Sequence, residues 1–441
     1  MIIAQTRAMC NRCPSASHPA ELVRTGTRIE GVVHCPDGDI RHDVSSDADL
    51  FIAIREKSAT DITSTAPPRG LRNVLNYISI TNACNLNCAV CGAGAKTGTD
   101  AAVFLSVDEI CKRAEQAKKA GGRILHLFGG EPTLHPDLLT IVEKISGLGF
   151  SSGVVTNGVR LGADKALARK LKARGLARIC LQFDSFNEET LEALGRNFLR
   201  EKKEAITNAC EAGLSIGLNC TVTRLNLEEV GDLLTHGLEI GINVRNMTFA
   251  SAAPVGRYTL AQQDSVDREQ IIRQLLTVGE KHGFSLDDIF PLPAYLPWGI
   301  QNHPDCGAHL VLVHTPDGIQ PLNRLIDMAA VYARMARSRL RRNYCSTRLV
   351  PAWFVLRAIR PGKWASCLRI ASGLAFSKRR YSLVNVGISN YKGAAFLDEQ
   401  RLARCASAFH TSVGPVKGCL HFFRDQAFPG SKEYEDAHGS C

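Results

Sequence analysis

The sequence predicts an α/β fold in which a parallel sheet curls into a partial (β/α)6 barrel, and two observations support this. Between residues 73 and 255, apolar strand-like runs alternate six times with helix-like stretches, as in parallel strands joined by right-handed crossovers. The residues suited to chemistry follow directly after these strands, and active sites of such barrels form at the carboxyl ends of the strands. We therefore expect one barrel with its site at that edge.

The individual elements follow from local composition and capping. The expected strands span residues 76–81, 123–128, 152–155, 178–183, 214–221 and 243–249. The expected helices span residues 106–120, 136–147, 163–174, 187–212 and 227–238. The first helix begins at Ser106 with Glu109 three residues later, which is the pattern of a capping box.

Three cysteines, Cys84, Cys88 and Cys91, follow the first strand at C-x3-C-x2-C spacing. Three thiolates this close in sequence suit three irons of a 4Fe–4S cluster. The fourth iron would have no protein ligand and would be open to a substrate or cofactor. The alternatives are a zinc knuckle that lacks one ligand and a chance cluster of cysteines.

The second strand ends in Gly129-Gly130-Glu131-Pro132. Two glycines allow the backbone to approach a ligand closely, Glu131 offers an acceptor for an ammonium group, and Pro132 stops the strand. Taken alone, these residues are typical of a turn. After a cysteine loop of this spacing, they indicate a cofactor site.

Together, these motifs resemble the radical S-adenosylmethionine (SAM) enzymes over residues 76–255. The resemblance implies that the three cysteines hold 4Fe–4S and that SAM binds the fourth iron. It also implies a set of SAM-contacting residues: Gly129, Gly130, Glu131, Asn157, Asp184 and Asn219. For Asn157, Asp184 and Asn219 a purely structural role is an equal alternative. Val90 departs from the family pattern, because many members have an aromatic residue at that position.

Residues 1–60 are expected to form a small rubredoxin-like or zinc-ribbon-like metal module with a short helix over 48–57. The visible ligands for iron or zinc are Cys10, Cys13 and Cys35. The fourth ligand stays open among three histidines: His18, His34 and His42. The alternative is a knuckle that has lost its metal. Residues 58–72 are rich in Ser, Thr and Pro and indicate a linker.

Residues 256–441 are expected to form an α+β extension that binds an auxiliary 4Fe–4S cluster and the substrate. The best candidate ligands are Cys306, Cys405 and Cys419. A second cluster would need further ligands from Cys345, Cys367, His303 and His410. Cysteines inside expected helices and strands are interpreted as small buried hydrophobes: Cys111, Cys180, Cys210 and Cys220.

The two ends of the chain are similar to tetraether lipid synthases and to the related dihydropterin methyltransferases. The matching stretches are Thr6 to Cys13, His34-Cys35-Pro36, Ser45 to Leu50, His303 to Gly307 followed by Pro321 to Asp327, and the tail from Asp398 to Cys405 and on to Cys419. Those relatives usually have Cys-Pro-x-His-Gly where this chain has no histidine after Pro36.

From Arg334 to Arg380 the sequence has thirteen Lys or Arg and no Asp or Glu, and it includes Trp353 and Trp364. We expect two basic amphipathic helices with a break at Pro361-Gly362. Such helices suit an anionic membrane surface. The alternatives are a solvated basic helix packed on the barrel, or nucleic acid, which the lack of a recognisable RNA-binding module disfavours.

The overall composition is that of a globular protein, with 441 residues, 45% hydrophobic and 22% charged. No apolar run reaches the length of a membrane span, and the start of the chain has no apolar signal core. We therefore expect a cytoplasmic protein, with peripheral association with a membrane as an option. Sixteen cysteines in such a protein indicate metals rather than disulfides.

The resemblance implies reductive cleavage of SAM to a 5′-deoxyadenosyl radical, which removes hydrogen from an unactivated C–H bond, with ferredoxin or flavodoxin as the electron donor. The first hypothesis is a lipid-like substrate and a reaction that forms or modifies a C–C bond. The alternatives are methylation of a pterin or another small heterocycle, modification of a peptide, and a non-catalytic Fe–S electron carrier.

Overall fold

The computed structural model describes residues 1–10, 17–58, 73, 75–97, 102–291, 303–337, 355–377, 380–391, 396–405, 407–412 and 414–427. Several sequence predictions fall outside these residues: Cys13, nearly all of the linker over 58–72, Cys345, and part of the basic region over 334–380.

The core of the molecule is a run of six adjacent parallel strands. They are β5 (Leu75–Thr81), β9 (Ile124–Gly129), β10 (Ser151–Thr156), β11 (Arg178–Gln182), β12 (Ser215–Val222) and β13 (Val244–Ser251). Their order in the sheet is their order in the chain. The predicted partial barrel is therefore confirmed, and the predicted strand ends move by only one or two residues.

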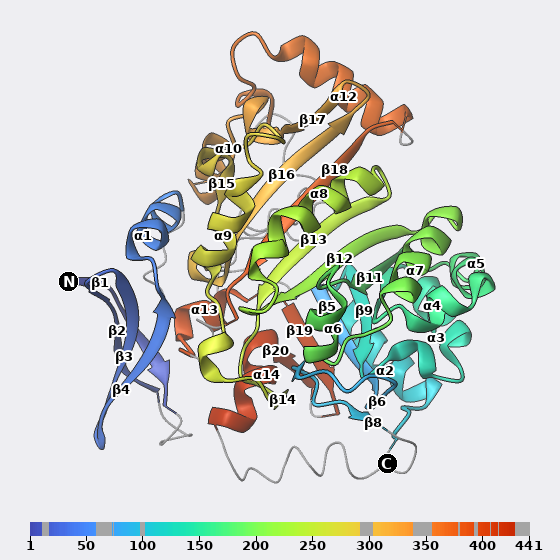
Figure 1. Ribbon diagram of the computed structural model, residues 1–441, viewed down its shortest axis with the longest axis horizontal. Helices are drawn as coiled ribbons and strands as arrows, with labels where there is room; N and C mark the ends of the chain where they lie inside the picture. The colour runs from blue at the N-terminus through green and yellow to red at the C-terminus, as the bar shows by residue number, and fades with distance from the viewer. Residues whose placement is uncertain are drawn as a thin grey trace.

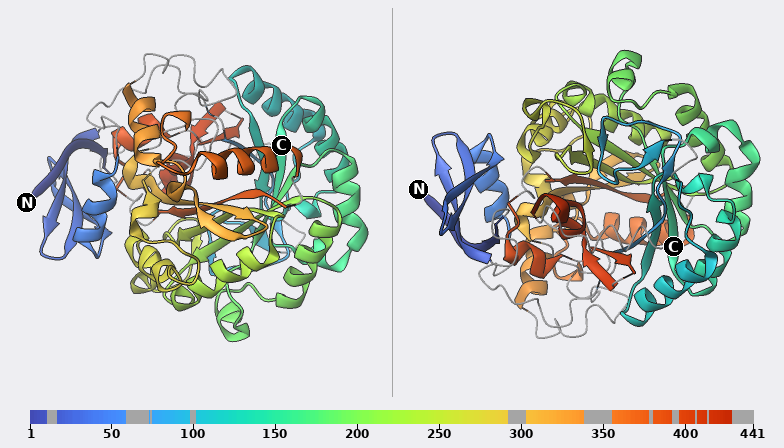
Figure 2. Two further views of the ribbon diagram at one scale, coloured as in Figure 1. Left: turned by 90° about the horizontal axis from the view of Figure 1, so that it is seen from above. Right: turned by 90° about the horizontal axis from the view of Figure 1, so that it is seen from below.

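Helices cover the convex face of this sheet, as Figures 1 and 2 show. They are α2 (Val107–Lys119), α3 (Leu138–Gly147), α4 (Val159–Ala163), α5 (Lys165–Ala173), α6 (Glu188–Ala193), α7 (Leu199–Glu211), α8 (Val230–Ile240) and α9 (Arg268–Thr277). Apolar strand residues such as Ile78, Leu127 and Leu181 pack with these helices in the main hydrophobic core. The apolar positions that alternate along each strand therefore decide which face the helices cover.

The opposite, concave face of the sheet has a different lining. Its strand residues alternate with the core residues and keep partial exposure, among them Gln182, Asn219, Asn246, Thr248 and Asn385. Because side chains point to opposite faces at successive positions, these polar groups share the concave side. The inside of the barrel is thus polar over strands β11 to β13.

The C-terminal extension adds strands to both edges of the six-stranded core. On the β13 edge, β18 (Ser382–Ser389) is parallel to β13, and β16 (Gly307–Thr315) is antiparallel to β18. On the β5 edge, β19 (Ser407–Thr411) is parallel to β5 and pairs with β20 (Gly414–Lys417). The sequence predicted only the central six strands of this twelve-stranded sheet.

Helix α14 (Gly418–Ala427) returns to the concave side after β20. The ring of Phe422 lies 6.2 Å from the ring of Phe128 on β9 and 5.0 Å from Phe409 on β19. A residue near the end of the chain therefore lines the same face as the core strands.

The N-terminal module is an antiparallel four-stranded sheet followed by a helix. Its elements are β1 (Ile2–Met9), β2 (Ser17–Thr25), β3 (Arg28–Cys35), β4 (Gly38–Ser45) and α1 (Ala48–Glu56). The backbone N–H of Met9 donates to the carbonyl of Leu397 at 3.0 Å, and Phe396 belongs to the core of this module. The C-terminal extension thus completes the N-terminal module.

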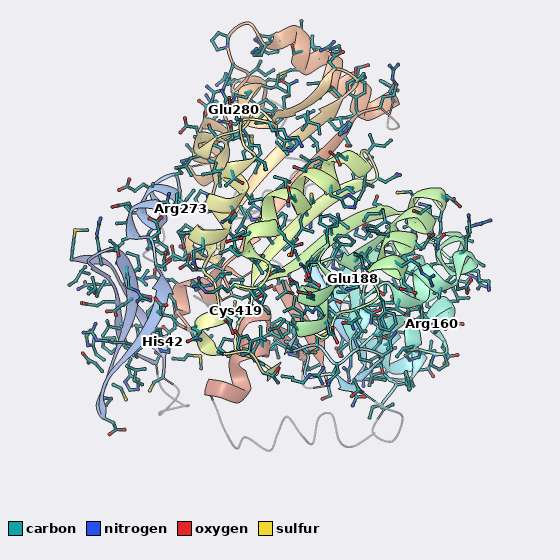
Figure 3. All side chains as sticks on the ribbon, viewed as in Figure 1. His42, Arg160, Glu188, Arg273, Glu280 and Cys419 are labelled. Atoms are coloured by element: carbon teal, nitrogen blue, oxygen red, sulfur yellow. The ribbon has the colours of Figure 1, made fainter. Side chains whose placement is uncertain are left out.

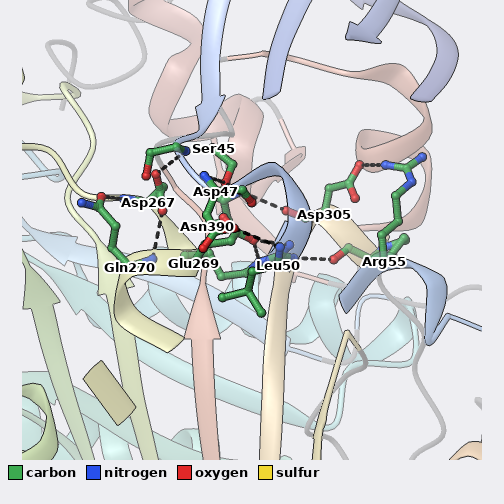
Figure 4. Close-up of polar contacts among 12 residues, drawn as sticks. Ser45, Asp47, Leu50, Arg55, Asp267, Glu269, Gln270, Asp305 and Asn390 are labelled. Carbon is green, nitrogen blue, oxygen red and sulfur yellow. Dashed lines mark hydrogen bonds and ion pairs between the residues drawn. The ribbon is translucent and has the colours of Figure 1, made fainter. Parts of the chain in front are cut away.

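Buried polar contacts fix the module to the barrel (Figure 4). The Asp267 carboxylate accepts from the Ser46 N–H at 2.7 Å, and Arg55 forms a buried ion pair with Asp305. These contacts join α1 to α9 and to the segment before β16. Removing one charge of the Arg55–Asp305 pair would leave the other buried without compensation. The pair therefore fixes the position of the module against the barrel.

One buried histidine makes folding stability depend on pH. Burial, assisted by the charge of Arg178, lowers the pKa of His126 from 6.5 to about 3. Below pH 6.5 the unfolded chain therefore binds a proton that the folded chain refuses until about pH 3, so stability falls as pH drops through this window. We expect His126→Gln to flatten the pH dependence of urea unfolding between pH 7 and 4 by at most about 1.4 kcal/mol per pH unit. An unchanged slope would contradict this assignment.

Candidate active site

The three cysteines of the predicted cluster loop lie at the carboxyl end of β5. Cys84 ends β6 (Ala83–Cys84) and Cys91 ends β7 (Val90–Cys91). Cys84 and Cys91 are half-buried and Cys88 is buried. The N–H groups of Leu86 and Ala95 donate to the sulfurs of Cys84 and Cys91, each at 3.4 Å. N–H groups directed at sulfur favour the thiolate form that binds iron.

The Gly-Gly-Glu-Pro turn holds the backbone that enters this loop. Gly130 N–H donates to the Thr81 carbonyl and Glu131 N–H to the Ala83 carbonyl, both at 2.7 Å. A Cβ atom on Gly129 would collide with the Thr81 carbonyl oxygen, and one on Gly130 with that of Ala83. The two glycines therefore allow the ends of two neighbouring strands to approach each other closely.

Glu131 is a buried brace between β9 and β10. Its Oε1 accepts from the Thr133 N–H and from the hydroxyls of Thr133 and Thr156, at 2.6–3.0 Å. Among the described residues, its Oε2 accepts from the Asn157 N–H alone, at 2.7 Å. Burial raises the pKa of Glu131, and these hydrogen bonds act in the opposite direction. Oε2 therefore keeps a lone pair for a further donor.

Asn157 links the end of β10 to the cysteine loop. Its side-chain Nδ2 donates to Asn85 Oδ1 at 2.7 Å, and its Oδ1 accepts from the Val159 N–H. The structure thus brings Asn157, Glu131 and the cysteine loop together, as the sequence predicted, and shows a positioning contact that the sequence did not indicate.

Arg196 is a site residue that the sequence analysis missed. Its Nη2 donates to the Val90 carbonyl at 2.9 Å, and its Nη1 pairs with Asp184 Oδ1 at 2.8 Å. Both side chains are buried. Asp184 Oδ1 also accepts from the Thr221 N–H, whereas Oδ2 has no partner among the described residues. Arg196 follows an ordinary turn in the sequence, and only the folded chain carries its guanidinium to the cysteine loop.

Lys202 is a second cation that the sequence did not single out. It is 1% exposed, and its Nζ has no hydrogen-bond partner in the described part of the chain. Burial lowers its pKa, while the charges of Asp184 and Cys88 act to raise it. A buried amine without a partner costs free energy, so Lys202 Nζ is a candidate donor to a ligand.

Residues that follow the predicted barrel, which ends at residue 255, also donate hydrogen bonds to the cysteine loop. Arg257 donates to the carbonyls of Cys88 and Ala95 at 2.9 and 2.8 Å, and the Thr259 N–H donates to the Ala89 carbonyl at 2.9 Å. Asn219, by contrast, lies on the concave face two residues before the Thr221 contact with Asp184. Its side chain makes no hydrogen bond with the cysteine loop among the described residues.

The donor set fits an iron–sulfur cluster. Burial, together with the nearby Glu131, Cys88 and Cys91, raises the pKa of Cys84 to about 11 when no cation is present, although the Leu86 N–H opposes this. In the described residues, the three sulfurs do not form a group within 4.8 Å, as ligands of one ion would. Three cysteine thiols in one loop are nevertheless the type of ligand that iron–sulfur clusters use.

The N-terminal module contains a tighter group. The ligand atoms of Cys10, His18 and Cys35 all lie within 4.8 Å of one another, which suits a single zinc or iron ion. Among the three candidate histidines, His34 instead pairs with Asp39 at the surface, and the ring of His42 packs 6.0 Å from that of Phe396. Cys13 lies outside the described residues.

The three C-terminal cysteines gather around Arg401. Burial raises the pKa of Cys306, and the Arg401 charge opposes this shift. Burial, with the charges of Cys405 and Cys306 adding to it, raises the pKa of Cys419 to about 12. Cys419 lies between the N-terminal sheet and the barrel (Figure 3). The predicted trio is thus brought together.

The other residues predicted as possible ligands of an auxiliary cluster differ in whether a ligand atom lacks a hydrogen-bond partner. Cys367 packs in a separate apolar cluster, and His410 is hydrogen-bonded to Asn76 at 2.8 Å. His303 is buried, its ring contacts the Asp305 N–H, and its Nε2 has no partner among the described residues. Among the described residues, His303 Nε2 and His410 Nδ1 therefore remain without a hydrogen-bond partner, whereas the Cys367 thiol donates to the Leu325 carbonyl at 3.9 Å.

The hydrogen bonds from Gly130 and Glu131 to Thr81 and Ala83 form a clamp on the backbone that enters the cysteine loop. The close contact of Gly130 with Ala83 allows a direct test of this clamp. We expect Gly130→Ala to lower stability by about 1–3 kcal/mol, because the added methyl group forces the strand ends apart, and to lower iron retention after reconstitution. Gly147→Ala is the matched control, since a Cβ there meets nothing within 4 Å and should leave iron content unchanged. Thermal unfolding and iron analysis measure both. Wild-type iron content in Gly130→Ala would contradict the clamp.

Comparisons with known proteins agree with this geometry. Residues 78–236 match the family model of the Radical SAM superfamily. A 7,8-dihydro-6-hydroxymethylpterin dimethyltransferase from Methanocaldococcus jannaschii is 27% identical over 370 residues, which are 74% of this chain and 71% of that protein. A probable GTP 3′,8-cyclase from Saccharolobus solfataricus is 33% identical over 197 residues, 44% of this chain and 62% of that protein.

Among solved structures, Streptococcus suis SuiB bound to S-adenosylmethionine aligns with a TM-score of 0.42 at 17% identity, covering 48% of each chain. The family match spans the cysteine loop, the Gly-Gly-Glu-Pro turn and the strand ends that hold them. Residues 78–236 are therefore a domain of the Radical SAM superfamily.

Proposed function

We propose that this enzyme modifies a C–H bond of a small, flat, polar heterocycle held against the concave face of the barrel, with methyl transfer as the reaction class. The observation that carries the proposal is the lining of that face, which is aromatic on one side and rich in amides on the other.

The aromatic side is formed by β5, β9, β19 and α14. The rings of Tyr77 and Phe409 stack at 4.7 Å with an interplanar angle of 10°, and Phe128 and Phe422 meet this pair edge-on. Tyr77 and Phe128 keep partial exposure. An aromatic surface of this kind favours stacking of a flat ring.

The amide side is formed by β12, β13 and β18. Asn246 donates to the Thr248 hydroxyl at 2.8 Å and accepts from Asn385 at 2.7 Å. Each amide carries donors and acceptors in one plane, which matches the edge of a heterocycle that has both ring nitrogens and carbonyl groups. Pockets of this composition orient a ligand through a few convergent polar groups.

The buried atoms with spare capacity near the cysteine loop suit the amino-acid part of SAM. They are Glu131 Oε2 and Asp184 Oδ2 for an ammonium group, and Lys202 Nζ for a carboxylate. When bound, the cluster and SAM supply a 5′-deoxyadenosyl radical that removes a hydrogen atom. The residues of this chain position the cluster loop, exclude water and orient the substrate.

The relatives support a heterocyclic substrate, since one is named a pterin dimethyltransferase and others are named GTP cyclases. The first sequence hypothesis, a lipid-like substrate, remains the second candidate because α12 (Trp364–Phe376) exposes large apolar side chains. That helix precedes β18, so it lies at the opposite edge of the sheet from the cysteine loop (Figure 1). The polar lining therefore favours the heterocycle.

We also propose two further metal centres: one ion at Cys10, His18 and Cys35, and one auxiliary 4Fe–4S cluster at Cys306, Cys405 and Cys419, with His303 as the candidate fourth ligand. A low-potential donor such as ferredoxin or flavodoxin would reduce the enzyme, and the net charge of +10 favours such acidic partners.

Counting irons tests the auxiliary cluster. After anaerobic reconstitution, we expect the Cys84→Ala/Cys88→Ala/Cys91→Ala variant to keep about four irons with matching sulfide, the content of one 4Fe–4S cluster. Adding Cys306→Ala and Cys419→Ala should remove them. Adding Cys111→Ala is the control, because this cysteine lies on the outer helix α2. Loss of all sulfide-linked iron in the first variant would overturn the auxiliary cluster.

Turnover tests the substrate. With dithionite and SAM, we expect a dihydropterin to yield 5′-deoxyadenosine and a product heavier by one CH2 unit, whereas an acyl lipid yields neither. Thr248→Val should raise KM for the heterocycle by roughly fivefold, the value of one hydrogen bond of about 1 kcal/mol. SAM cleavage without substrate should not change.

Thr207→Val is the matched control, because Thr207 is exposed on the outer helix α7. Coupled turnover of the lipid, with none of the heterocycle, would reverse the order of the two candidates.

A further inference from the structure

Helix α12 (Trp364–Phe376) carries an apolar stripe that nothing in the described structure covers. Trp364, Leu368 and Phe376 are 49%, 63% and 88% exposed, and Leu356, just before the helix, is 45% exposed. At 3.6 residues per turn, Trp364 and Leu368 share one face with Ala371 and Ala375, and both alanines are exposed as well.

The other face of α12 is packed on the protein. Ile370 is buried, Cys367 and Leu374 contact the same apolar cluster, and a Cβ on Gly373 would press into the ring of Tyr381. The inner face of the helix is therefore well packed, so the exposure of its outer stripe does not result from poor packing of the helix on the protein. Exposed apolar patches of this kind mark interaction sites.

The charge around the stripe identifies the partner. Between Asp327 and Asp398 the sequence has fourteen Lys or Arg and no Asp or Glu. Lys363 and Arg380 flank the helix and are exposed, and Arg369 on the helix pairs only with the exposed Asp317 among the described acids. Apolar side chains that include a Trp, with cations at their border, match the interface of an anionic bilayer.

We propose that α12 binds the surface of an anionic membrane, with Trp364, Leu368 and Phe376 inserted among the acyl chains and the flanking cations on the headgroups. The helix would lie in the interface plane, since no helix in the described ranges has the length and apolarity needed to cross a bilayer. A partner rich in phosphate alone, such as nucleic acid, has no use for the apolar stripe.

Binding through α12 would attach the enzyme to the membrane but would not deliver a lipid substrate to the active site. Helix α12 ends just before β18 begins, and β18 is parallel to β13, so α12 lies at the amino-terminal edge of the strands. The cysteine loop lies at the carboxyl edge, and Figure 1 places the two at opposite ends of the molecule. The proposal is thus independent of the substrate.

Vesicle sedimentation of the full chain tests the proposal. We expect binding to phosphatidylcholine vesicles that contain phosphatidylglycerol, at least tenfold weaker binding to phosphatidylcholine alone, and loss of binding at high salt. Leu368→Asp/Phe376→Asp should weaken binding at least tenfold without changing the thermal unfolding midpoint, because both side chains are exposed.

Ile2→Asp is the matched control, since Ile2 is 53% exposed on the distant N-terminal sheet, and it should bind as the wild type does. The proposal would be overturned if the double variant bound vesicles as well as the wild type, or if the wild type bound neither kind of vesicle. It would also be overturned if the wild type formed dimers and the double variant did not. The last result would assign the stripe to a second copy of the chain.

Discussion

The hydrogen bonds that hold the backbone of the cysteine loop are the constraint on which the rest of the site depends. The end of β9 donates to the carbonyls of Thr81 and Ala83, Arg196 donates to Val90, and Arg257 donates to Cys88. Each donor comes from a different part of the chain. The loop is short and its sulfurs need fixed spacing, so its geometry is set from outside by the ends of the strands.

This arrangement explains why buried charges gather at one edge of the sheet. Arg196 donates to Val90 and pairs with Asp184, both side chains are buried, and Asp184 is in turn held by the backbone of Thr221. Glu131 has the same role between β9 and β10. Such groups are costly to bury, and among the described residues Asp184 Oδ2 has no hydrogen-bond partner.

The central part of the fold could be predicted from sequence because its signals are local. Six apolar runs, each followed by an amphipathic stretch, define β5 to β13 and their helices, and the position of Cys84 and Gly129 after strands defines the edge of the site. The edges of the sheet were not predicted, because β18 and β19 are far from their partner strands in the sequence and no local signal links them to those partners.

The same distinction holds within the site. The cysteines and the Gly-Gly-Glu-Pro turn have characteristic spacing, whereas Arg196, Lys202 and Arg257 are ordinary cations in the sequence and gain their roles only through tertiary contacts. The glycines also have a role that the motif did not indicate, because they let two neighbouring strand ends approach each other closely. His18 was one of three candidate histidines, and only folding separated it from His34 and His42.

The most direct test of this account is the electron paramagnetic resonance spectrum of the reduced, reconstituted protein with and without SAM. Three clamped thiolates leave one iron open, so SAM should change the cluster signal in the wild type. The change should be absent in the Cys84→Ala/Cys88→Ala/Cys91→Ala variant. A wild-type signal that SAM leaves unaltered, or a SAM-dependent signal that survives in the triple variant, would contradict the assignment of this loop as the SAM-binding cluster site.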